Sequence, residues 1–350
     1  LHAVEQLCSF MISGNNELQI LSSSIERKYE TFIFDSLDDF FDTSLLVHVI
    51  RKFVKHNLRS ILTEVDPDTD WTDYIKFSLS QHIFSFLPSQ ESAIRKGLLK
   101  FDKAFSLKMP TSAGKSYITE LLIYKELKTN PHAKVLYLAP LRSLSRELQF
   151  RFRRVGSNLG FTTRAIYGGS TFTIDQDILK DARLLISTPE SFSIMEDSLE
   201  EQLTQFSLVI CDEGQLLDSL NRGINYELLL TRLKRIEGIR YLFLSAIIPN
   251  IEDVNTWLGG SKTDIGDSDY RPCPIKLATI KNKFDLIIKN ENYDADKYII
   301  RNFLSSEESE SIGSSQKAKA SALALKAVSA GPVMLFTARK EGKMGCVAIG

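Results

Sequence analysis

Residues 109–116, MPTSAGKS, place small residues, a lysine and a hydroxyl between an apolar run and a helical pattern. The phosphate-binding loop of nucleotide hydrolases has the pattern G-x-x-x-x-G-K-S/T. Gly114, Lys115 and Ser116 match the end of this pattern, whereas Met109 replaces its first glycine. A helix that starts after such a loop directs backbone N–H groups and the positive end of its dipole at an anion. The stretch predicts phosphate binding; its plainer interpretation is a serine-capped helix with an incidental lysine.

Each residue of this loop has a chemical reason to contact a nucleotide. Gly114 lets the backbone approach a phosphate, because glycine carries no Cβ. Lys115 reaches the outer phosphates, and the hydroxyl of Ser116 can ligate Mg²⁺. The remaining loop residues expected to contact the nucleotide are Thr111, Ser112 and Ala113. The loop therefore predicts ATP and Mg²⁺ as cofactors.

Two acidic residues end a second apolar run, SLVICDEGQ at residues 207–215. Asp212 suits a ligand of Mg²⁺, and Glu213 suits a base that accepts the proton of an attacking water. The plainer interpretation is a pair of acids that cap the next helix. Because the phosphate loop precedes them by about a hundred residues, the two motifs together predict a magnesium-dependent nucleotide hydrolase.

Short β-rich runs alternate with helical patterns from about residue 100 onward. The expected strands are residues 104–107, 134–140, 162–167, 183–188, 206–212 and 239–246. The expected helices are residues 115–129, 142–155, 190–197, 222–236 and 250–258. Strands that alternate with helices indicate an α/β fold with a parallel, doubly wound sheet. Continuous apolar runs such as LVIC suit strands that are buried on both faces.

The pattern predicts three regions along the chain. Residues 1–85 have apolar residues at helical spacing and form a helical N-terminal extension, with no catalytic cluster. Residues 86–270 hold the α/β domain described above. Residues 271–350 are expected to begin a second α/β domain that is cut short, since PVMLFTA at 332–338 has the pattern of a buried strand. Leu1 in place of an initiator methionine and the abrupt end at Gly350 indicate a piece of a longer protein.

Composition limits the classes of protein to which the chain can belong. It has 350 residues, 43% of them hydrophobic, and a net charge of -1, so a nucleic-acid site must be a local groove. The four cysteines form no CxxC pair, which predicts neither a zinc site nor a disulfide framework and fits a cytoplasmic location. Without an apolar run of about 18 residues, no transmembrane helix and no membrane partner are expected.

Further motifs surround the phosphate loop and the acid pair in a fixed order. LPSQESAI at residues 87–94 resembles the motif whose glutamine contacts adenine, which points to Gln90. The other matching stretches are LAPLRSLSREL at 138–148, STPES at 187–191 and LSAIIPNIEDVNTWLG at 244–259. With PTSAGKS and DEGQ, this set resembles the first motor domain of superfamily 2 DExH-box helicases. The similarity is to the superkiller-like group, which includes the helicase domain of DNA polymerase theta, with DEGQ as a bacterial variant of the box.

The resemblance, over about residues 85–280, implies a fold and a catalytic set. The fold is a RecA-like P-loop motor domain with a parallel sheet, followed by a truncated second RecA-like domain. The residues implied in hydrolysis of ATP are Lys115, Asp212, Glu213 and Gln215, the last as a sensor of the γ-phosphate. Ser245 and Ala246 occupy the motif that couples hydrolysis to movement.

The same resemblance implies contacts with a nucleic-acid strand. The residues implied to line its path are Arg142, Gly168, Gly169 and Thr188. Arg142 begins an arginine-rich segment, residues 142–154, whose other arginines have the pattern of a solvated helix face. For the glycines and Thr188, the plainer interpretation is ordinary turn and cap chemistry.

Two residues depart from the family pattern. Gln215 stands where the group usually has histidine, although glutamine can still donate and accept hydrogen bonds. Ile247 replaces a threonine and cannot form the hydroxyl link of that motif. Motifs V and VI, with the arginine finger, are not found before residue 350. We therefore expect this chain by itself to bind nucleotide better than it hydrolyses it.

Three interpretations of the function stay open at this point. The first is an ATP-dependent helicase or translocase that acts on DNA, 3′ to 5′ by resemblance, in genome maintenance or antiphage defence. The second is an RNA helicase of the same group, since no residue identifies a 2′-hydroxyl. The third is a nucleotide-binding switch without unwinding activity, which Ile247 and Gln215 favour and the intact acid pair opposes. In each case the N-terminal helical region is a candidate surface for a protein partner.

Overall fold

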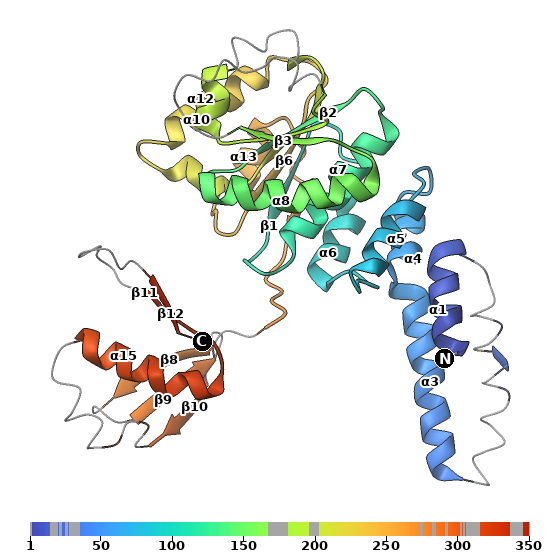
Figure 1. Cartoon of the computed structure of the whole chain (residues 1–350), viewed down its shortest axis with the longest axis vertical. Coiled ribbons are helices and arrows are strands. Elements are labelled where there is room, and N and C mark those ends of the chain that lie inside the picture. The colour runs from blue at the N-terminus through green and yellow to red at the C-terminus, as the bar shows by residue number, and fades with distance from the viewer. Residues whose placement is uncertain are drawn as a thin grey trace. The chain divides into compact units, whose positions relative to one another are not determined.

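The computed structural model describes residues 2–14, 36–166, 181–195 and 203–273, isolated positions between 20 and 27, and several stretches between 276 and 349. Contacts between residues divide the chain into two compact units, Leu1–Pro272 and Cys273–Gly350. Figure 1 shows the elements of each unit by label. The candidate site lies in the first unit.

The first unit is built on a seven-stranded sheet in the order β3-β4-β2-β5-β6-β1-β7. Its strands are β1 (Ala104–Lys108), β2 (Lys134–Leu138), β3 (Thr163–Ile166), β4 (Leu184–Ser187), β5 (Phe206–Cys211), β6 (Arg240–Ser245) and β7 (Ile265–Asp267). All neighbouring strands pair in parallel. The predicted α/β fold with a parallel sheet is confirmed, and so is each of the six predicted strands, whereas the short edge strand β7 was not predicted.

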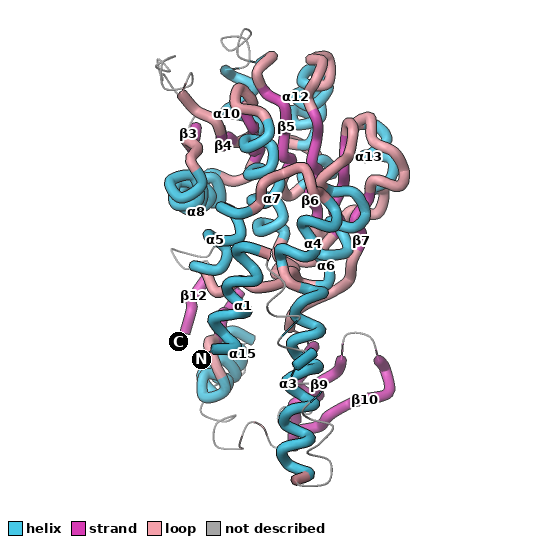
Figure 2. The backbone as a smooth tube through the Cα atoms, turned by 90° about the vertical axis from the view of Figure 1, so that its right-hand side faces the viewer, coloured by secondary structure: helices cyan, strands magenta, loops and turns pink. Residues whose placement is uncertain are grey.

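Helices cover both faces of this sheet. They include α7 (Lys115–Thr129), α8 (Arg142–Leu159), α10 (Pro189–Met195), α12 (Gly223–Leu233) and α13 (Ile251–Trp257). Successive strand residues enter different cores: Tyr137 joins the cluster under α7 and α8, and Leu136 joins the cluster under α10, α12 and α13. Figure 2 shows strands running between α8 on one side and α13 on the other. Burial on both faces explains the continuous apolar runs of the strand sequences.

The N-terminal residues that the structure describes are mostly helical, as their pattern predicted. The helices are α1 (His2–Ser13), α3 (Leu37–His56), α4 (Leu58–Val65), α5 (Thr72–Ser80) and α6 (Pro88–Ala93), and α6 continues into a π-helical turn, η1 (Ile94–Leu98). Tyr74 of α5 is fully buried, and its ring centroid lies 5.9 Å from that of Tyr117 on α7. The hydroxyls of Ser78 and Tyr117 are 3.0 Å apart. The N-terminal helices therefore share a core with α7.

The second unit contains antiparallel strands. β8 (Lys276–Lys281), β9 (Asp285–Asn290) and β10 (Tyr293–Ile300) form one sheet in sequence order, and β11 (Val333–Phe336) pairs with β12 (Cys346–Ile349). Helix α15 (Gln316–Ala327) and a short 3-10 helix, η4 (Val328–Ala330), precede β11. That this unit begins a second RecA-like domain stays a prediction. None of the helices described in either unit is long and apolar enough to cross a membrane.

Candidate active site

The phosphate loop leaves β1 and enters α7, as predicted. Gly114 has a positive φ of 83°, a conformation that residues with a side chain rarely adopt. A Cβ at this position would lie 2.0 Å from Nε2 of Gln90, so any larger residue would displace the Gln90 amide. Helix α7 then begins at Lys115, which directs its first N–H groups toward the loop. Ser116 lies in this first turn and is partly buried.

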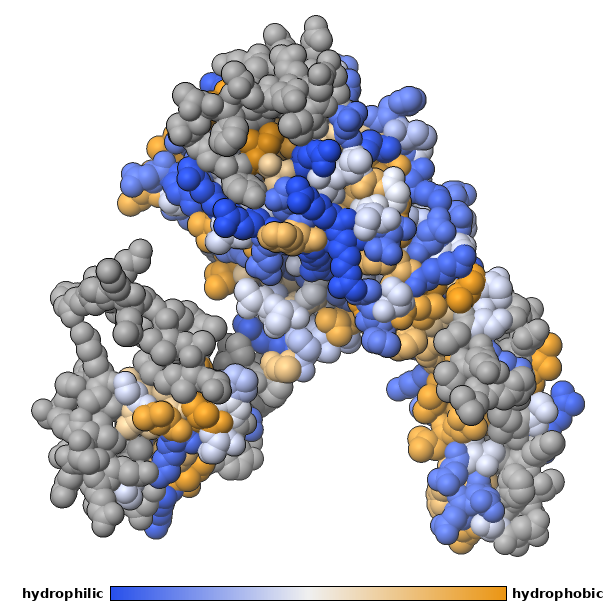
Figure 3. Space-filling view, in the orientation of Figure 1, coloured by the Kyte–Doolittle hydropathy of each residue, from blue (hydrophilic) through white to orange (hydrophobic). Residues whose placement is uncertain are grey.

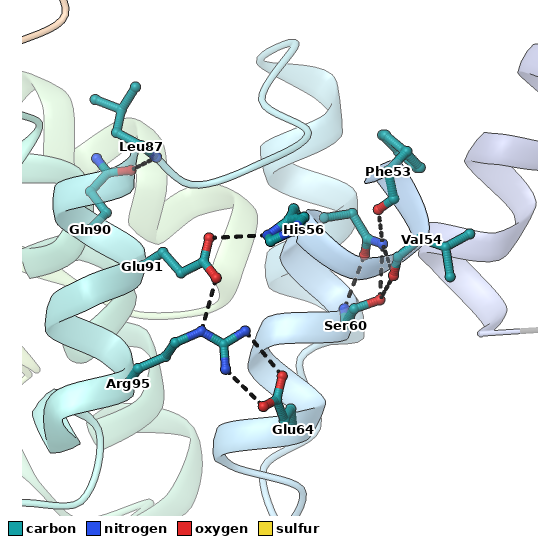
Figure 4. Close-up of polar contacts among 10 residues, drawn as sticks. Phe53, Val54, His56, Ser60, Glu64, Leu87, Gln90, Glu91 and Arg95 are labelled. Carbon is teal, nitrogen blue, oxygen red and sulfur yellow. Dashed lines mark hydrogen bonds and ion pairs between the residues drawn. The ribbon is translucent and has the colours of Figure 1, made fainter. Parts of the chain in front are cut away.

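Gln90 of α6 lies against the loop. Its amide nitrogen donates to the carbonyl of Gly114 at 3.1 Å. Its Oε1 accepts from the backbone N–H of Leu87 at 2.8 Å, as Figure 4 shows. The neighbouring Ser89 hydroxyl donates to the carbonyl of Ala113 at 3.2 Å. Helix α6 is therefore attached to the loop at two successive carbonyls. The contact of Gln90 with adenine stays a prediction, now with a position next to the loop.

Lys115 is folded back over its own loop. Its Nζ donates to the carbonyl of Met109 at 2.9 Å and to that of Pro110 at 3.4 Å. Burial lowers the pKa of Lys115, and the carboxylates of Glu213 and Asp212 oppose this shift. The lysine is therefore within electrostatic reach of both acids. The other loop residues predicted to contact nucleotide are placed differently: Thr111 and Ser112 are exposed and Ala113 is buried.

Asp212 directly follows β5 and is almost fully buried. Its Oδ2 accepts from the hydroxyl of Tyr137 at 2.7 Å, and its Oδ1 accepts from the backbone N–H of Glu213 at 2.9 Å. Burial raises the pKa of Asp212, while the hydrogen bond from Tyr137 lowers it. Tyr137 was missed by the sequence analysis, because nothing in its sequence context distinguishes it from other residues of a buried strand.

Glu213 is connected to β6 by a chain of two hydrogen bonds. The amide nitrogen of Gln215 donates to Oε2 of Glu213, and the hydroxyl of Ser245 donates to Oε1 of Gln215 at 3.0 Å. Ser245 also accepts, through its carbonyl, from the backbone N–H of Met109 at 3.1 Å. The residue after Ser245, Ala246, is partly buried, and Ile247 is 78% exposed. The structure thus joins the acid pair, β6 and the start of the phosphate loop through Ser245.

Close packing also explains the glycine of the DEGQ box. Glu213 has a positive φ of 50°, and the 3-10 helix η3 (Gly214–Asp218) begins after it. A Cβ on Gly214 would lie 2.1 Å from the ring of Phe243 on β6. Glycine therefore lets the box turn tightly against β6, which brings Gln215 within reach of Ser245.

The donor set fits a hard cation between the loop and the acid pair. The Ser116 hydroxyl and the Asp212 carboxylate are oxygen ligands of the kind that Mg²⁺ prefers, and both follow strands that flank β6. Among the described residues, no group of three or more His, Cys, Asp and Glu gathers into an all-protein metal site. A set with few protein ligands suits an ion that also binds a substrate phosphate.

Two of the residues predicted to contact nucleic acid line the same cavity. Arg142, at the start of α8, and Thr188, before α10, border a cavity of about 370 Å³. The hydroxyl of Thr188 lies 2.9 Å from that of Ser191 and accepts from the Ser191 backbone N–H at 3.2 Å, so it caps α10. The other two predicted residues, Gly168 and Gly169, lie outside the described residues.

Arg222, which is not among the predicted site residues, also lines this cavity. Its Nε donates to Glu190 of α10 at 2.6 Å, and its Nη2 donates to the carbonyl of Pro140 after β2. Arg222 also lines a second cavity of about 720 Å³, which Glu213 and Gln215 border. Burial by itself would raise the pKa of Glu190, but the hydrogen bond from Arg222 holds this pKa below its usual range. No motif of the sequence indicates this contact between segments far apart in the chain.

Comparisons with known proteins agree with these features. Residues 87–254 match the DEAD/DEAH box helicase family. Hachiman protein HamB of Bacillus cereus is 34% identical over 65% of this chain and 21% of its own length. ATP-dependent DNA helicase Hel308 of Methanocaldococcus jannaschii is 28% identical over 60% of this chain and 17% of its own length. The activating signal cointegrator 1 complex subunit 3 of Dictyostelium discoideum is 30% identical over 57% of this chain and 10% of its own length.

This chain spans about a fifth of the length of the first two of these relatives, and less of the third. The matched region runs from α6 to α13 and includes Gln90, the phosphate loop, the acid pair and Ser245. The parallel sheet places the phosphate loop, the acid pair and Ser245 at the carboxyl ends of the neighbouring strands β1, β5 and β6. The chain therefore contains a DEAD/DEAH box helicase domain, as its motifs predicted.

Proposed function

We propose that this protein is an ATP-dependent helicase or translocase that acts on DNA in genome maintenance or antiphage defence. One observation carries the proposal: Lys115 lies within electrostatic reach of Asp212 and Glu213, and Glu213 is joined through Gln215 to Ser245. This arrangement unites phosphate binding, a base and a link to a third motif. Similarity to ATP-dependent DNA helicase Hel308 supports DNA as the polymer.

Each residue of the site has a role in this proposal. The backbone N–H groups at the start of α7 and the Lys115 amine bind the phosphates of ATP, because both are positive and point at the loop. Ser116 and Asp212 would hold Mg²⁺, which neutralises phosphate charge when bound. Glu213 accepts the proton of the attacking water, and the amide of Gln215 orients its carboxylate.

The hydrogen bonds of Ser245 suggest how the site responds to phosphate. Ser245 contacts both Gln215, through its hydroxyl, and the start of the phosphate loop, through its carbonyl. A shift of the loop on nucleotide binding therefore moves Ser245, and through its hydrogen bonds also moves Gln215 and the Glu213 carboxylate. The hydroxyl link that Ile247 cannot form is not needed for this contact, which weakens the case for a switch without turnover.

The test is ATP turnover by the full-length protein, measured alone, with single-stranded DNA and with single-stranded RNA. Lys115→Ala is expected to abolish nucleotide binding, and Glu213→Gln is expected to keep binding and lose turnover. Stimulation by DNA supports the proposal. Stimulation by RNA alone would replace DNA by RNA as the polymer, and no stimulation by either with ATP still bound would identify a nucleotide-binding switch.

A further inference from the structure

Helix α8 has two faces of opposite character. The residues buried under it are Ser145, Leu148, Phe152, Val155 and Gly156. With 3.6 residues per turn, the opposite side is formed by residues that recur three and four positions apart. These are Arg142, Arg146, Phe150, Arg153 and Arg154, and all five are exposed. We call this surface the arginine face.

The fifth arginine of the helix is used differently. Arg151 forms an ion pair of 3.1 Å with Glu120 of α7, whose side chain is only 5% exposed. It therefore fixes α8 to α7 and does not belong to the arginine face. The one acidic residue of α8, Glu147, is also exposed; it lies three positions before Phe150, at the edge of the arginine face, and lines the cavity that Glu213 also borders.

The concentration of charge on this face is local. The chain as a whole has a net charge of -1, yet four arginines lie on one side of a single helix with one acidic residue, Glu147, beside them. Figure 3 shows deep-blue, hydrophilic side chains gathered over α8. Phe150 lies within the face and is 67% exposed, so its ring is open to contact by a partner.

The arginine face is continuous with the cavity of about 370 Å³, which two residues predicted to contact nucleic acid line. Arg142 belongs to both, since it begins α8 and lines the cavity with Thr188. From Arg142 to Arg154 the helix advances by twelve residues, which corresponds to about 18 Å at about 1.5 Å per residue. The face therefore leads away from the cavity over a length that spans several nucleotides.

We propose that the arginine face is a second nucleic-acid-binding surface, which takes the part of the strand that extends beyond the cavity. This inference rests on the proposed function. Guanidinium groups match phosphate in charge and geometry, and an exposed aromatic ring among them suits stacking of a base. The combination favours a nucleic acid over an acidic protein, which has no bases to stack on Phe150. Residues Arg153 and Arg154 bind backbone phosphates, and Phe150 packs on a base.

The experiment compares two lengths of single-stranded DNA, about 6 and about 20 nucleotides, chosen around the site sizes of single-strand binding folds. The full-length Arg153→Ala/Arg154→Ala variant is expected to bind the long strand severalfold more weakly and the short strand unchanged. For this variant, the slope of log affinity against log salt concentration should be shallower by about 1.4, because two phosphate contacts on a single strand contribute about 0.7 each. Phe150→Ala should weaken binding of the long strand without changing the dependence of that binding on salt.

The matched control is Arg235→Ala/Lys262→Ala, which removes two exposed positive charges elsewhere on the unit. All variants should keep the turnover of ATP without nucleic acid, because none of these residues contacts the loop or the acid pair. Three results would overturn the inference. The control and the Arg153/Arg154 variant could weaken DNA binding equally, or the Arg153/Arg154 variant could leave DNA binding unchanged. That variant could also lose the same affinity for both lengths of DNA. A wild-type protein that binds neither length would instead overturn the proposed function.

Discussion

Glu120 is a nearly buried carboxylate on α7, and burial raises its pKa although Arg151 opposes the shift. The folded state therefore binds a proton at this site more tightly than the unfolded state does. As pH rises from the unfolded pKa of glutamate, about 4.3, through the higher folded pKa, this group lowers the free energy of unfolding. Glu120→Gln should thus raise Tm near neutral pH and leave it unchanged near pH 4.

The measurement is a series of thermal unfolding curves of the wild type and of Glu120→Gln between these two pH values. Arg151 is 39% exposed, so water can solvate its charge when Glu120 is replaced. A lower Tm for the variant at neutral pH would mean that the ion pair with Arg151 outweighs the burial of the carboxylate.

Gly114 offers a second test at the scale of one residue. Its φ of 83° and the 2.0 Å that would separate an added Cβ from Gln90 both oppose a side chain. Gly114→Ala should weaken ATP binding by about 5- to 150-fold, if backbone strain of about 1–3 kcal/mol appears in the loop. Gly160→Ala is the matched control, because Gly160 has a φ of 81° with nothing within 4 Å of the position that a Cβ would take.

In that control the strain lies at the end of α8, away from the loop, so stability should fall while ATP binding is kept. Isothermal titration and thermal unfolding separate the two effects. If both variants lose ATP binding to the same degree, the contact with Gln90 has no part in shaping the loop.

Residue types in local motifs were enough to predict which residues gather at the centre of the candidate site. The spacing in MPTSAGKS and DEGQ predicted that Lys115 and Asp212 serve one site, and the structure brings them within electrostatic reach. The contacts of Tyr137 and Arg222 were not predictable in this way. Each joins residues from segments 75 to 82 positions apart, and only the folded sheet brings those segments together.

Arg222 makes a prediction at the scale of elements. Its guanidinium joins the segment after β2, the start of α10 and the turn before α12. Pro140 and Arg222 line both cavities, and Glu190 lines the cavity with Arg142 and Thr188. Loss of the link should therefore weaken the coupling between the residues predicted to contact nucleic acid and the acid pair. Arg222→Gln should keep the turnover of ATP without nucleic acid and lose most of the stimulation by nucleic acid.

A double-mutant cycle with Glu190→Gln distinguishes this link from general damage. If the two residues act through each other, the double variant should be no worse than either single variant. Additive losses in stimulation would show that Arg222 and Glu190 act independently. The exposed fractions of the two side chains, 36% and 39%, make a large loss of stability an unexpected result.

The strands differ in how well their sequences predict them. The six longer strands have apolar runs, so their existence followed from periodicity. The three-residue strand β7 has no such run; it is an edge strand formed because Ile265 and Gly266 lie beside Ser106 and Leu107 of β1. A Cβ on Gly266 would lie 2.5 Å from Leu107, so tight packing, which sequence periodicity does not reveal, fixes this edge.

At the scale of the whole molecule, the N-terminal helices are part of the core that supports the site. Trp71 and Tyr74 are almost fully buried, and their rings pack on Tyr124 of α7 at centroid distances of 5.8 and 5.3 Å. Helix α7 carries Lys115 and Ser116 at its start. Figure 4 shows a further connection, in which Arg95 joins Glu64 of α4 to Glu91 of α6.

This packing predicts which pieces of the chain fold. Residues 1–272 contain both large cores and should fold and bind ATP without the second unit. Residues 86–272 should not, because removal of α4 and α5 uncovers the aromatic side of α7, where each ring buries about 150–250 Å². Expression, thermal unfolding and ATP titration of the two pieces check this.

A conservative variant separates packing from the mere presence of the helices. Ser78→Ala removes one hydroxyl contact with Tyr117 and should lower the free energy of unfolding by only about 1 kcal/mol. Tyr74→Ala removes a fully buried ring from the same interface and should lower the free energy of unfolding by about 3–5 kcal/mol.

The two pieces of the chain give the contrasting outcomes. If residues 86–272 unfold at the same temperature as residues 1–272, the N-terminal helices do not contribute to the stability of the site. If they unfold far lower, the helicase domain requires α4 and α5 for its stability.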